Sequence, residues 1–176
     1  FSADNATPSS WDLVKTNAWP MAWKAIAVTI PLTAISFVVG LALALVTAIG
    51  RMSTSALPRG LARAYISVIR GTPLLVQLAI IFFGMPQLGI KLSPWPSAII
   101  AFSLNVAAYS AEIIRAAILS VPKGQWEAAE TIGMNRATAL RRIILPQALL
   151  AAIPPGTNLL IELLKNTSLV SLITLS

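Results

Sequence analysis

The chain has 176 residues, of which 56% are hydrophobic and 11% are charged, and its formal net charge is +7. A soluble domain carries about 25% charged residues, so the composition excludes an ordinary soluble protein and favours one embedded in a membrane. The chain has no Cys and no His, which excludes disulfides, zinc sites built on those residues and histidine general bases.

Residues 1–18 are polar and are predicted to form an irregular extracytoplasmic segment ahead of a transmembrane domain over residues 19–176. Residues 20–49 are predicted as the first membrane helix, since they hold a single charge, Lys24, and exceed the roughly 20 apolar residues that a spanning helix needs. Trp is enriched at membrane interfaces, which favours the outer rim over ordinary packing for Trp11, Trp19 and Trp23.

The second segment is predicted to start near Leu61 and to run through Arg70-Gly71-Thr72-Pro73 as far as Phe83. Gly and Pro inside one helix indicate a bend or a close backbone crossing. Arg70 has two interpretations: a long side chain that reaches the cytoplasmic surface, or a buried functional charge. The Gly- and Pro-rich stretch from Gly84 to Pro96 is expected to form an outer loop.

A third helix is predicted over residues 97–120. It carries Asn105 and Glu112 at membrane depth, where polar groups usually face a bundle interior or a wet cavity. Glu112 and Arg115 lie three positions apart, so a local ion pair on one helix face is the alternative interpretation.

Pro122-Lys123-Gly124 is expected to end the third helix, and two short amphipathic helices are predicted next, over residues 125–132 and 135–144. Gly133 between them fits a left-handed C-terminal cap, where a Cβ would be unfavourable. An interfacial hairpin with no partner is an alternative that spacing alone does not exclude.

A fourth segment runs from Gln147 to Leu175, and Pro154-Pro155-Gly156 is expected to break it. Its polar residues include Asn158, Glu162 and Asn166. Transporters often hold substrates where broken helices carry polar groups at membrane depth. Glu162 can instead pair with Lys165.

The basic residues gather in two of the connections, which hold Arg51, Arg59 and Arg63 in one and Arg115, Lys123, Arg136, Arg141 and Arg142 in the other. The connection between the second and third segments has only Lys91. Lys and Arg accumulate on the cytoplasmic side of membrane proteins. The distribution therefore predicts an N-terminus outside the cell and residues 127–146 inside, and it favours an orientation signal over a nucleic-acid-binding surface.

The stretch from Glu127 to Pro146 has the layout E-A-A-x3-G-x9-I-x-L-P, and it resembles the cytoplasmic loop of ABC-importer membrane subunits. Three further stretches resemble the permeases of polar amino-acid importers, with the cystine-type permeases closest: Arg70–Gln77, Ala108–Ala129 and Leu163–Leu169. The resemblance covers about residues 20–176.

The resemblance implies an all-α, polytopic type I importer fold with short cytoplasmic coupling helices. Members usually carry five membrane helices, so a fifth is expected after residue 176. It implies a permease subunit that forms the pathway for a polar amino acid, cystine among the candidates, in the bacterial inner membrane. Its expected partners are a second identical or similar permease, a cytoplasmic ATPase pair, an extracytoplasmic substrate-binding protein and lipid, with no nucleic acid.

No catalytic residue, cofactor or metal is expected in this chain, because ATP and Mg²⁺ would bind the ATPase. The resemblance assigns the coupling role to residues 125–146, here named the coupling segment. Its coupling residues would be Glu127, Ala128, Ala129, Gly133, Leu145 and Pro146. The substrate-pathway candidates, chosen because they are polar at membrane depth, are Asn105, Glu112, Asn158, Glu162 and Asn166.

Two other functions are weighed against this one. The first is a channel or structural membrane component that works without an ATPase. The second is a membrane enzyme, which the residue inventory disfavours: His and Cys are absent, the only Asp residues are Asp4 and Asp12 in the polar N-terminal stretch, and no G-x4-G-K-[ST] phosphate loop is present.

Overall fold

The computed structural model describes residues 10–170, and within that range every regular element is a helix, as the sequence predicts. The α-helices are α1 (Ser10–Met52), α2 (Ala56–Gly71), α3 (Leu74–Ala79), α4 (Pro94–Ser120), α5 (Lys123–Thr131), α6 (Arg136–Ala139) and α7 (Leu145–Asn166). Two π-helical turns, η1 (Ile80–Gly84) and η3 (Leu140–Ile144), and two 3₁₀ turns, η2 (Met85–Leu88) and η4 (Thr167–Leu169), complete the chain.

Three helical stretches in the described part are long and apolar enough to cross a membrane: Ile26–Met52, Pro94–Ser120 and Arg136–Leu169. A fourth candidate is the pair Ala56–Gly71 and Leu74–Leu88, which is bent by 105° at a short break. Counted as one broken span, this pair brings the number to the four segments that the sequence predicts. The bend falls at Thr72-Pro73, inside the motif where Gly and Pro indicate it.

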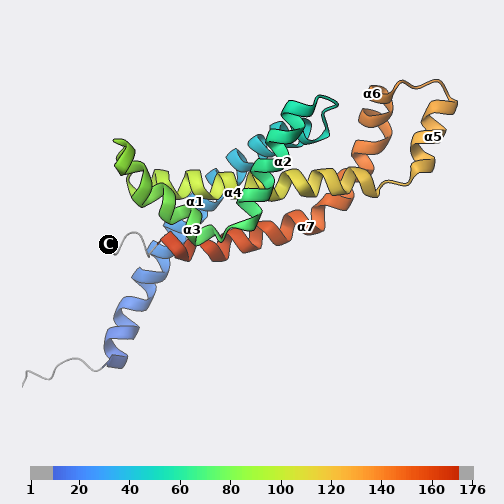
Figure 1. Cartoon of the computed structure of the whole chain (residues 1–176). Helices are drawn as coiled ribbons and strands as arrows, with labels where there is room; N and C mark the ends of the chain where they lie inside the picture. The colour runs from blue at the N-terminus through green and yellow to red at the C-terminus, as the bar shows by residue number, and fades with distance from the viewer. Residues whose placement is uncertain (1–9, 171–176) are drawn as a thin grey trace, which may run out of the picture.

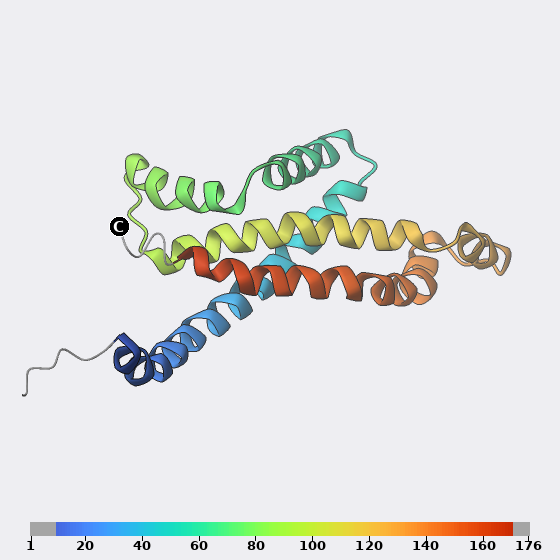
Figure 2. The ribbon, with the colours of Figure 1, turned by 90° about the horizontal axis from the view of Figure 1, so that it is seen from below.

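Helix α4 is the centre of the bundle. Figures 1 and 2 show α7 running alongside α4, with α1 crossing this pair. Helices α2 and α3 together form a bent limb that contacts α4. The main core joins Leu32 of α1, Leu78 of α3, Phe102 of α4 and Leu159 of α7. Small side chains on α4 allow this close packing, because helices in a membrane associate through backbone approach rather than hydrophobic burial; they are Ala98, Ala101, Ala107, Ala108 and Ala111, all buried.

The tightest crossing joins α1 to α4 at Gly40. A Cβ added there would lie 2.6 Å from Cβ and Cγ1 of Val106 and 3.0 Å from the carbonyl oxygen of Ser103. We expect Gly40→Ala to force the two helices apart and to lower the free energy of unfolding by roughly 1–3 kcal/mol. Thermal unfolding of the purified protein in detergent measures this loss.

Gly60→Ala is the matched control for that prediction. Gly60 lies in α2, and no described atom lies within 4 Å of the Cβ that the substitution adds. This variant should melt at the wild-type temperature or slightly above it, since Ala favours a helix over Gly. A Gly40→Ala protein that melts with the wild type would contradict the close crossing.

Helix starts differ from the sequence expectations. Helix α1 begins at Ser10, where an irregular segment is expected, and α2 begins at Ala56 rather than near Leu61. Ser and Asp favour a helix N-terminus, and Pro is tolerated in its first turn. The sequence prediction rests on the length of an apolar stretch that can span a membrane, and this length does not show where a helix extends past that stretch. Residues 1–9 and 171–176 lie outside the described residues.

The Trp expectation is tested only in part. Trp19 and Trp23 are exposed near the start of α1, 78% and 64% respectively, as an interfacial position requires. The side chain of Trp11 lies outside what the structure describes.

The predicted break at Pro154-Pro155-Gly156 is wrong, because α7 passes through both prolines as one helix. Each proline removes one backbone N–H from the helix, which leaves the carbonyls of Leu150 and Ala151, four residues earlier, without their usual donor. Membrane helices tolerate such prolines where neighbouring groups satisfy the freed carbonyls.

The second short helix predicted over residues 135–144 corresponds to α6 and η3, which together run from Arg136 to Ile144. No gap separates them from α7, since the three form one helical stretch, Arg136–Leu169. Figure 1 shows this stretch turning between α6 and α7. Pro146, in the first turn of α7, directly follows the π-helical turn η3, and prolines and π-helical turns are common causes of a change in helix direction.

Candidate functional site

Two parts of the structure hold the residues that the sequence singles out. The first is a hairpin, α5 with α6, which projects at the end of the bundle where α4 stops and α7 starts (Figure 1). Helix α4 ends at Ser120, and Pro122, in an extended conformation with φ −54° and ψ 138°, is the N-cap residue of α5. The expected stop at Pro122-Lys123-Gly124 is therefore confirmed, although α5 already begins at Lys123.

The turn after α5 is a Schellman C-cap. Gly133 has a φ of +75°, its N–H donates to the carbonyl of Glu130 at 2.9 Å, and the N–H of Met134 donates to the carbonyl of Ala129 at 3.0 Å. These two bonds satisfy carbonyls that a helix end leaves free. The left-handed cap that the sequence predicts at Gly133 is confirmed.

The next helix, α6, starts at Arg136, three residues after Gly133. The side-chain oxygen of Asn135 accepts a hydrogen bond of 2.8 Å from the N–H of Thr138, which is the usual N-cap arrangement. The two caps therefore fix a short turn between α5 and the long helical stretch that begins at Arg136.

The coupling residues differ in exposure. Glu127, Ala128, Gly133 and Pro146 are exposed, Leu145 is partly buried and Ala129 is fully buried. Glu127 makes no ion pair with any described residue. Glu127 and Ala128 are thus accessible to a partner, whereas Ala129 packs inside the protein and cannot meet one directly.

The hairpin is attached to both α4 and α7 by an apolar cluster. Ile118 of α4 and Val121, its C-cap residue, pack with Ile144 and Ala148, and Trp126 of α5 packs against the same cluster. The hairpin is therefore in direct contact with both helices through this cluster.

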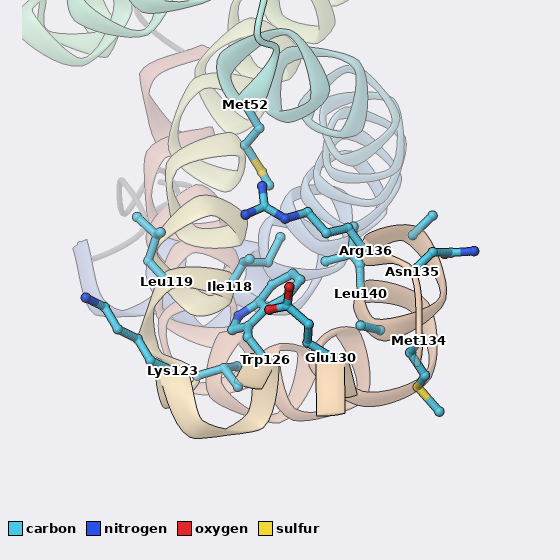
Figure 3. A pocket seen from close by; sticks show the side chains of 13 residues that line it. Met52, Ile118, Leu119, Lys123, Trp126, Glu130, Met134, Asn135, Arg136 and Leu140 are labelled. Atoms are coloured by element: carbon cyan, nitrogen blue, oxygen red, sulfur yellow. The ribbon is translucent and has the colours of Figure 1, made fainter. Parts of the chain in front are cut away.

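A pocket of about 720 Å³ lies between the hairpin and the ends of α1 and α4. Figure 3 shows Arg136 reaching toward Met52, with Trp126 and Glu130 beside one another on α5. Its walls are mainly apolar, and Leu119 and Leu140 complete them. The side of α5 that faces α1 and α4 is therefore not fully packed against them.

The second part is a cleft of about 500 Å³ bordered by the α2–α3 break, α4 and the end of α7, here named the polar cleft. It brings together three of the substrate-pathway candidates, Asn105, Glu162 and Asn166. Its other lining residues are Arg70, Gly71, Thr72, Pro73, Leu74, Leu75, Tyr109 and Leu169.

Two candidates lie elsewhere. Glu112 accepts a hydrogen bond of 2.9 Å from Nε of Arg115 and a second from its Nη2, so the local ion-pair interpretation is confirmed. Asn158 is exposed on α7 and does not line the cleft.

The polar cleft contains one cationic and one anionic side chain. The guanidinium carbon of Arg70 lies 5.1 Å from the centre of the Tyr109 ring, a cation–π arrangement. Arg70 therefore turns toward α4, but the residue remains exposed, so it is not the buried charge of the second interpretation. The alternative pairing of Glu162 with Lys165 is not seen, since the only ion pair among the described residues joins Arg115 to Glu112.

The substrate candidates drawn from the sequence omit Arg70 and Tyr109. A charge placed directly before a Gly-Thr-Pro break is the signal that could have identified Arg70, because broken helices line cavities. Tyr109 carries no such signal, since an aromatic residue in an apolar helix is usually part of the core.

Residues 40–176 match the family model for the binding-protein-dependent transport system inner membrane component. This chain belongs to that family. The resemblance to ABC-importer permeases is therefore confirmed, and this transport component has the all-helical permease fold. Members of the family are the membrane parts of such systems.

Similar proteins come from several amino-acid transport systems. The L-cystine transport system permease protein TcyB of Bacillus subtilis (strain 168) is 56% identical over 165 residues, which cover 94% of this transport component and 70% of TcyB. The probable amino-acid ABC transporter permease protein YckA of the same organism is 46% identical over 157 residues, covering 89% and 70%.

A solved structure described as an amino acid ABC transporter with histidines superposes with a TM-score of 0.88 at 38% identity, covering 92% of this transport component and 76% of that chain. The MetNI methionine ABC transporter in an inward-facing conformation gives a TM-score of 0.63 at 24% identity over 96% of this chain and 77% of that one, which supports the fold alone.

Proposed function

We propose that this chain forms the translocation pathway for a polar amino acid in an ATP-driven importer, with L-cystine as the first substrate to test. The observation that carries the proposal is the polar cleft, which holds Arg70 and Glu162 in one space between helices. The amino-acid permeases among its relatives support the substrate class.

The cleft suits a zwitterion. A guanidinium binds a carboxylate through two parallel hydrogen bonds, and a carboxylate accepts hydrogen bonds from an ammonium group. Arg70 and Glu162 supply these two groups, and the amides of Asn105 and Asn166 supply neutral donors and acceptors. The volume of about 500 Å³ lies within the range of small-molecule sites.

The coupling segment would seat on a cytoplasmic ATPase. Glu127 and Ala128 are exposed on α5, where such a partner can reach them. Closure of the ATPase pair on ATP would move the hairpin as a rigid body, and the apolar cluster would pass this motion to α4 and α7. This motion would open the cleft first to one side of the membrane and then to the other.

The remaining assignments follow from this arrangement. A second permease, identical or similar, would complete the pathway, and a substrate-binding protein would deliver the amino acid on the side where the N-terminus lies. ATP and Mg²⁺ would bind the ATPase, so this chain would carry no cofactor and perform no catalysis.

Reconstitution tests the proposal. The permease would be co-purified with its ATPase, placed in liposomes with its binding protein outside, and supplied with radiolabelled L-cystine, L-arginine or L-glutamine. We expect ATP-dependent accumulation of at least one of the three. Flux or conductance that persists without the ATPase would overturn the proposal and favour a channel.

A further inference from the structure

The break between α2 and α3 leaves helix carbonyls without partners. Helix α2 ends at Gly71, and Thr72 and Pro73 are both extended, with ψ values of 138° and 140°. The last four carbonyls of a helix have no donor within it, and Pro73 has no N–H to offer. In a membrane such groups must be satisfied by protein or by water in a cavity, so carbonyls of the break that face protein need donors from side chains.

Gln77 supplies those donors from the first turns of α3. Its side chain is buried, with 7% of the residue exposed. Its Nε2 donates to the carbonyl of Ile69 at 2.7 Å and to that of Thr72 at 3.0 Å, so both amide hydrogens have a carbonyl partner. The hydroxyl of Thr72 donates to the carbonyl of Val68 at 2.9 Å and lies 3.1 Å from the same Nε2.

The other end of the Gln77 amide faces α4. Its Oε1 accepts a hydrogen bond of 3.3 Å from Nδ2 of Asn105. Asn105, Thr72 and Arg70 all line the polar cleft, whereas Gln77 itself does not. One buried amide on α3 is therefore bonded to the backbone at the end of α2, to the backbone within the break, and to a cleft residue on the neighbouring helix.

We propose that Gln77 is a positioning residue that holds the α2–α3 break in the bent geometry presenting Arg70 and Asn105 to the polar cleft. The inference rests on the proposed function, since it assumes that the cleft receives the transported amino acid. Gln77 acts through the groups it holds and need not touch the amino acid.

Two substitutions of Gln77 remove different sets of its hydrogen bonds. Gln77→Leu keeps the approximate shape and removes both the donors and the acceptor. Gln77→Glu keeps an acceptor for Asn105, but an ionised carboxylate donates nothing and repels the two carbonyls. In the reconstituted transporter, with radiolabelled L-cystine as the first probe, we expect both to lower uptake at least tenfold. Gln87→Leu, an exposed glutamine of η2 at the far end of the same limb, should stay within twofold of the wild type.

A mutant cycle distinguishes positioning from general weakening. Interacting residues give non-additive effects, whereas independent ones add. If Gln77 acts through Asn105 and the break, then adding Asn105→Ala to Gln77→Leu should lower uptake by less than twofold beyond Gln77→Leu alone. Multiplicative losses would mean that the two residues act independently.

The bend can be measured without transport. The chain has no Cys, so Leu57→Cys and Leu88→Cys place two spin labels at exposed positions, one on each limb. Each limb is about 20 Å long at 1.5 Å per residue, so straightening the span lengthens the label distance by more than about 10 Å. We expect a narrow distance distribution with Gln77 present and a longer, broader one in Gln77→Leu and Gln77→Glu.

The experiments distinguish failure of this inference from failure of the proposed function. Wild-type distances in both variants, whatever their uptake, would overturn the inference, as would multiplicative losses in the cycle. If Gln77→Leu fails to assemble, Gln77→Glu provides the same comparisons. If the unsubstituted transporter moves none of the three amino acids, the proposed function fails, while the distance measurement still tests whether Gln77 holds the bend.

Discussion

Gly133→Val will yield a permease that inserts into the membrane but no longer docks its ATPase or supports uptake. Gly133 has a φ of +75°, a conformation that costs residues with a Cβ roughly 1–2 kcal/mol and is least tolerated by β-branched side chains. No described atom lies within 4 Å of an added Cβ, so the penalty comes from the backbone alone. Co-purification of the ATPase with a tagged permease, together with uptake, measures the loss.

Two variants control that experiment. Gly133→Asn should retain most docking and uptake, because Asn tolerates the left-handed conformation. Gly124→Ala, in the first turn of α5, adds a Cβ with no described atom within 4 Å and without a positive φ, so it should match the wild type. Normal assembly and uptake in Gly133→Val would contradict the coupling role of this turn.

Glu162→Gln is expected to lower uptake by about 10–100-fold while leaving assembly with the ATPase intact. The substitution keeps the shape of the side chain and removes its charge. Hydrogen bonds to charged groups contribute about 1.5–3 kcal/mol, which corresponds to that range. Initial rates of radiolabelled amino-acid uptake in the reconstituted transporter measure the effect.

The same helix provides the controls for Glu162→Gln. Lys165→Gln and Asn158→Ala change exposed residues of α7 that do not line the polar cleft, and both should transport at the wild-type rate. Unchanged uptake in Glu162→Gln would remove Glu162 from the pathway. Strong loss in Asn158→Ala would instead restore the sequence-based candidate that the fold places outside the cleft.

Two proline-containing motifs illustrate what the sequence can and cannot predict. Both Arg70-Gly71-Thr72-Pro73 and Pro154-Pro155-Gly156 indicate a break, yet only the first is one. Near the first, Gln77 is placed to satisfy the carbonyls that the bend exposes. At the second, helix α7 continues through both prolines. A proline-containing motif therefore does not by itself state whether the chain bends.

The two candidate sites differ in the same way. The coupling turn is contiguous, so its glycine cap follows from local rules and is predicted correctly. The polar cleft assembles from three separate stretches of chain, and no local rule states which polar residues meet. Glu112 and Glu162 look equivalent in the sequence, but Glu112 has a partner one turn away and Glu162 faces the cleft.

Helix α7 begins beside the hairpin and carries Glu162 and Asn166 near its other end. At 1.5 Å per residue its 22 residues span about 33 Å. If α7 pivots at one end, a tilt of about 5° displaces the far end by roughly 3 Å, about the length of a hydrogen bond. A small rotation of α7 alone would therefore be enough to make or break ligand contacts in the polar cleft.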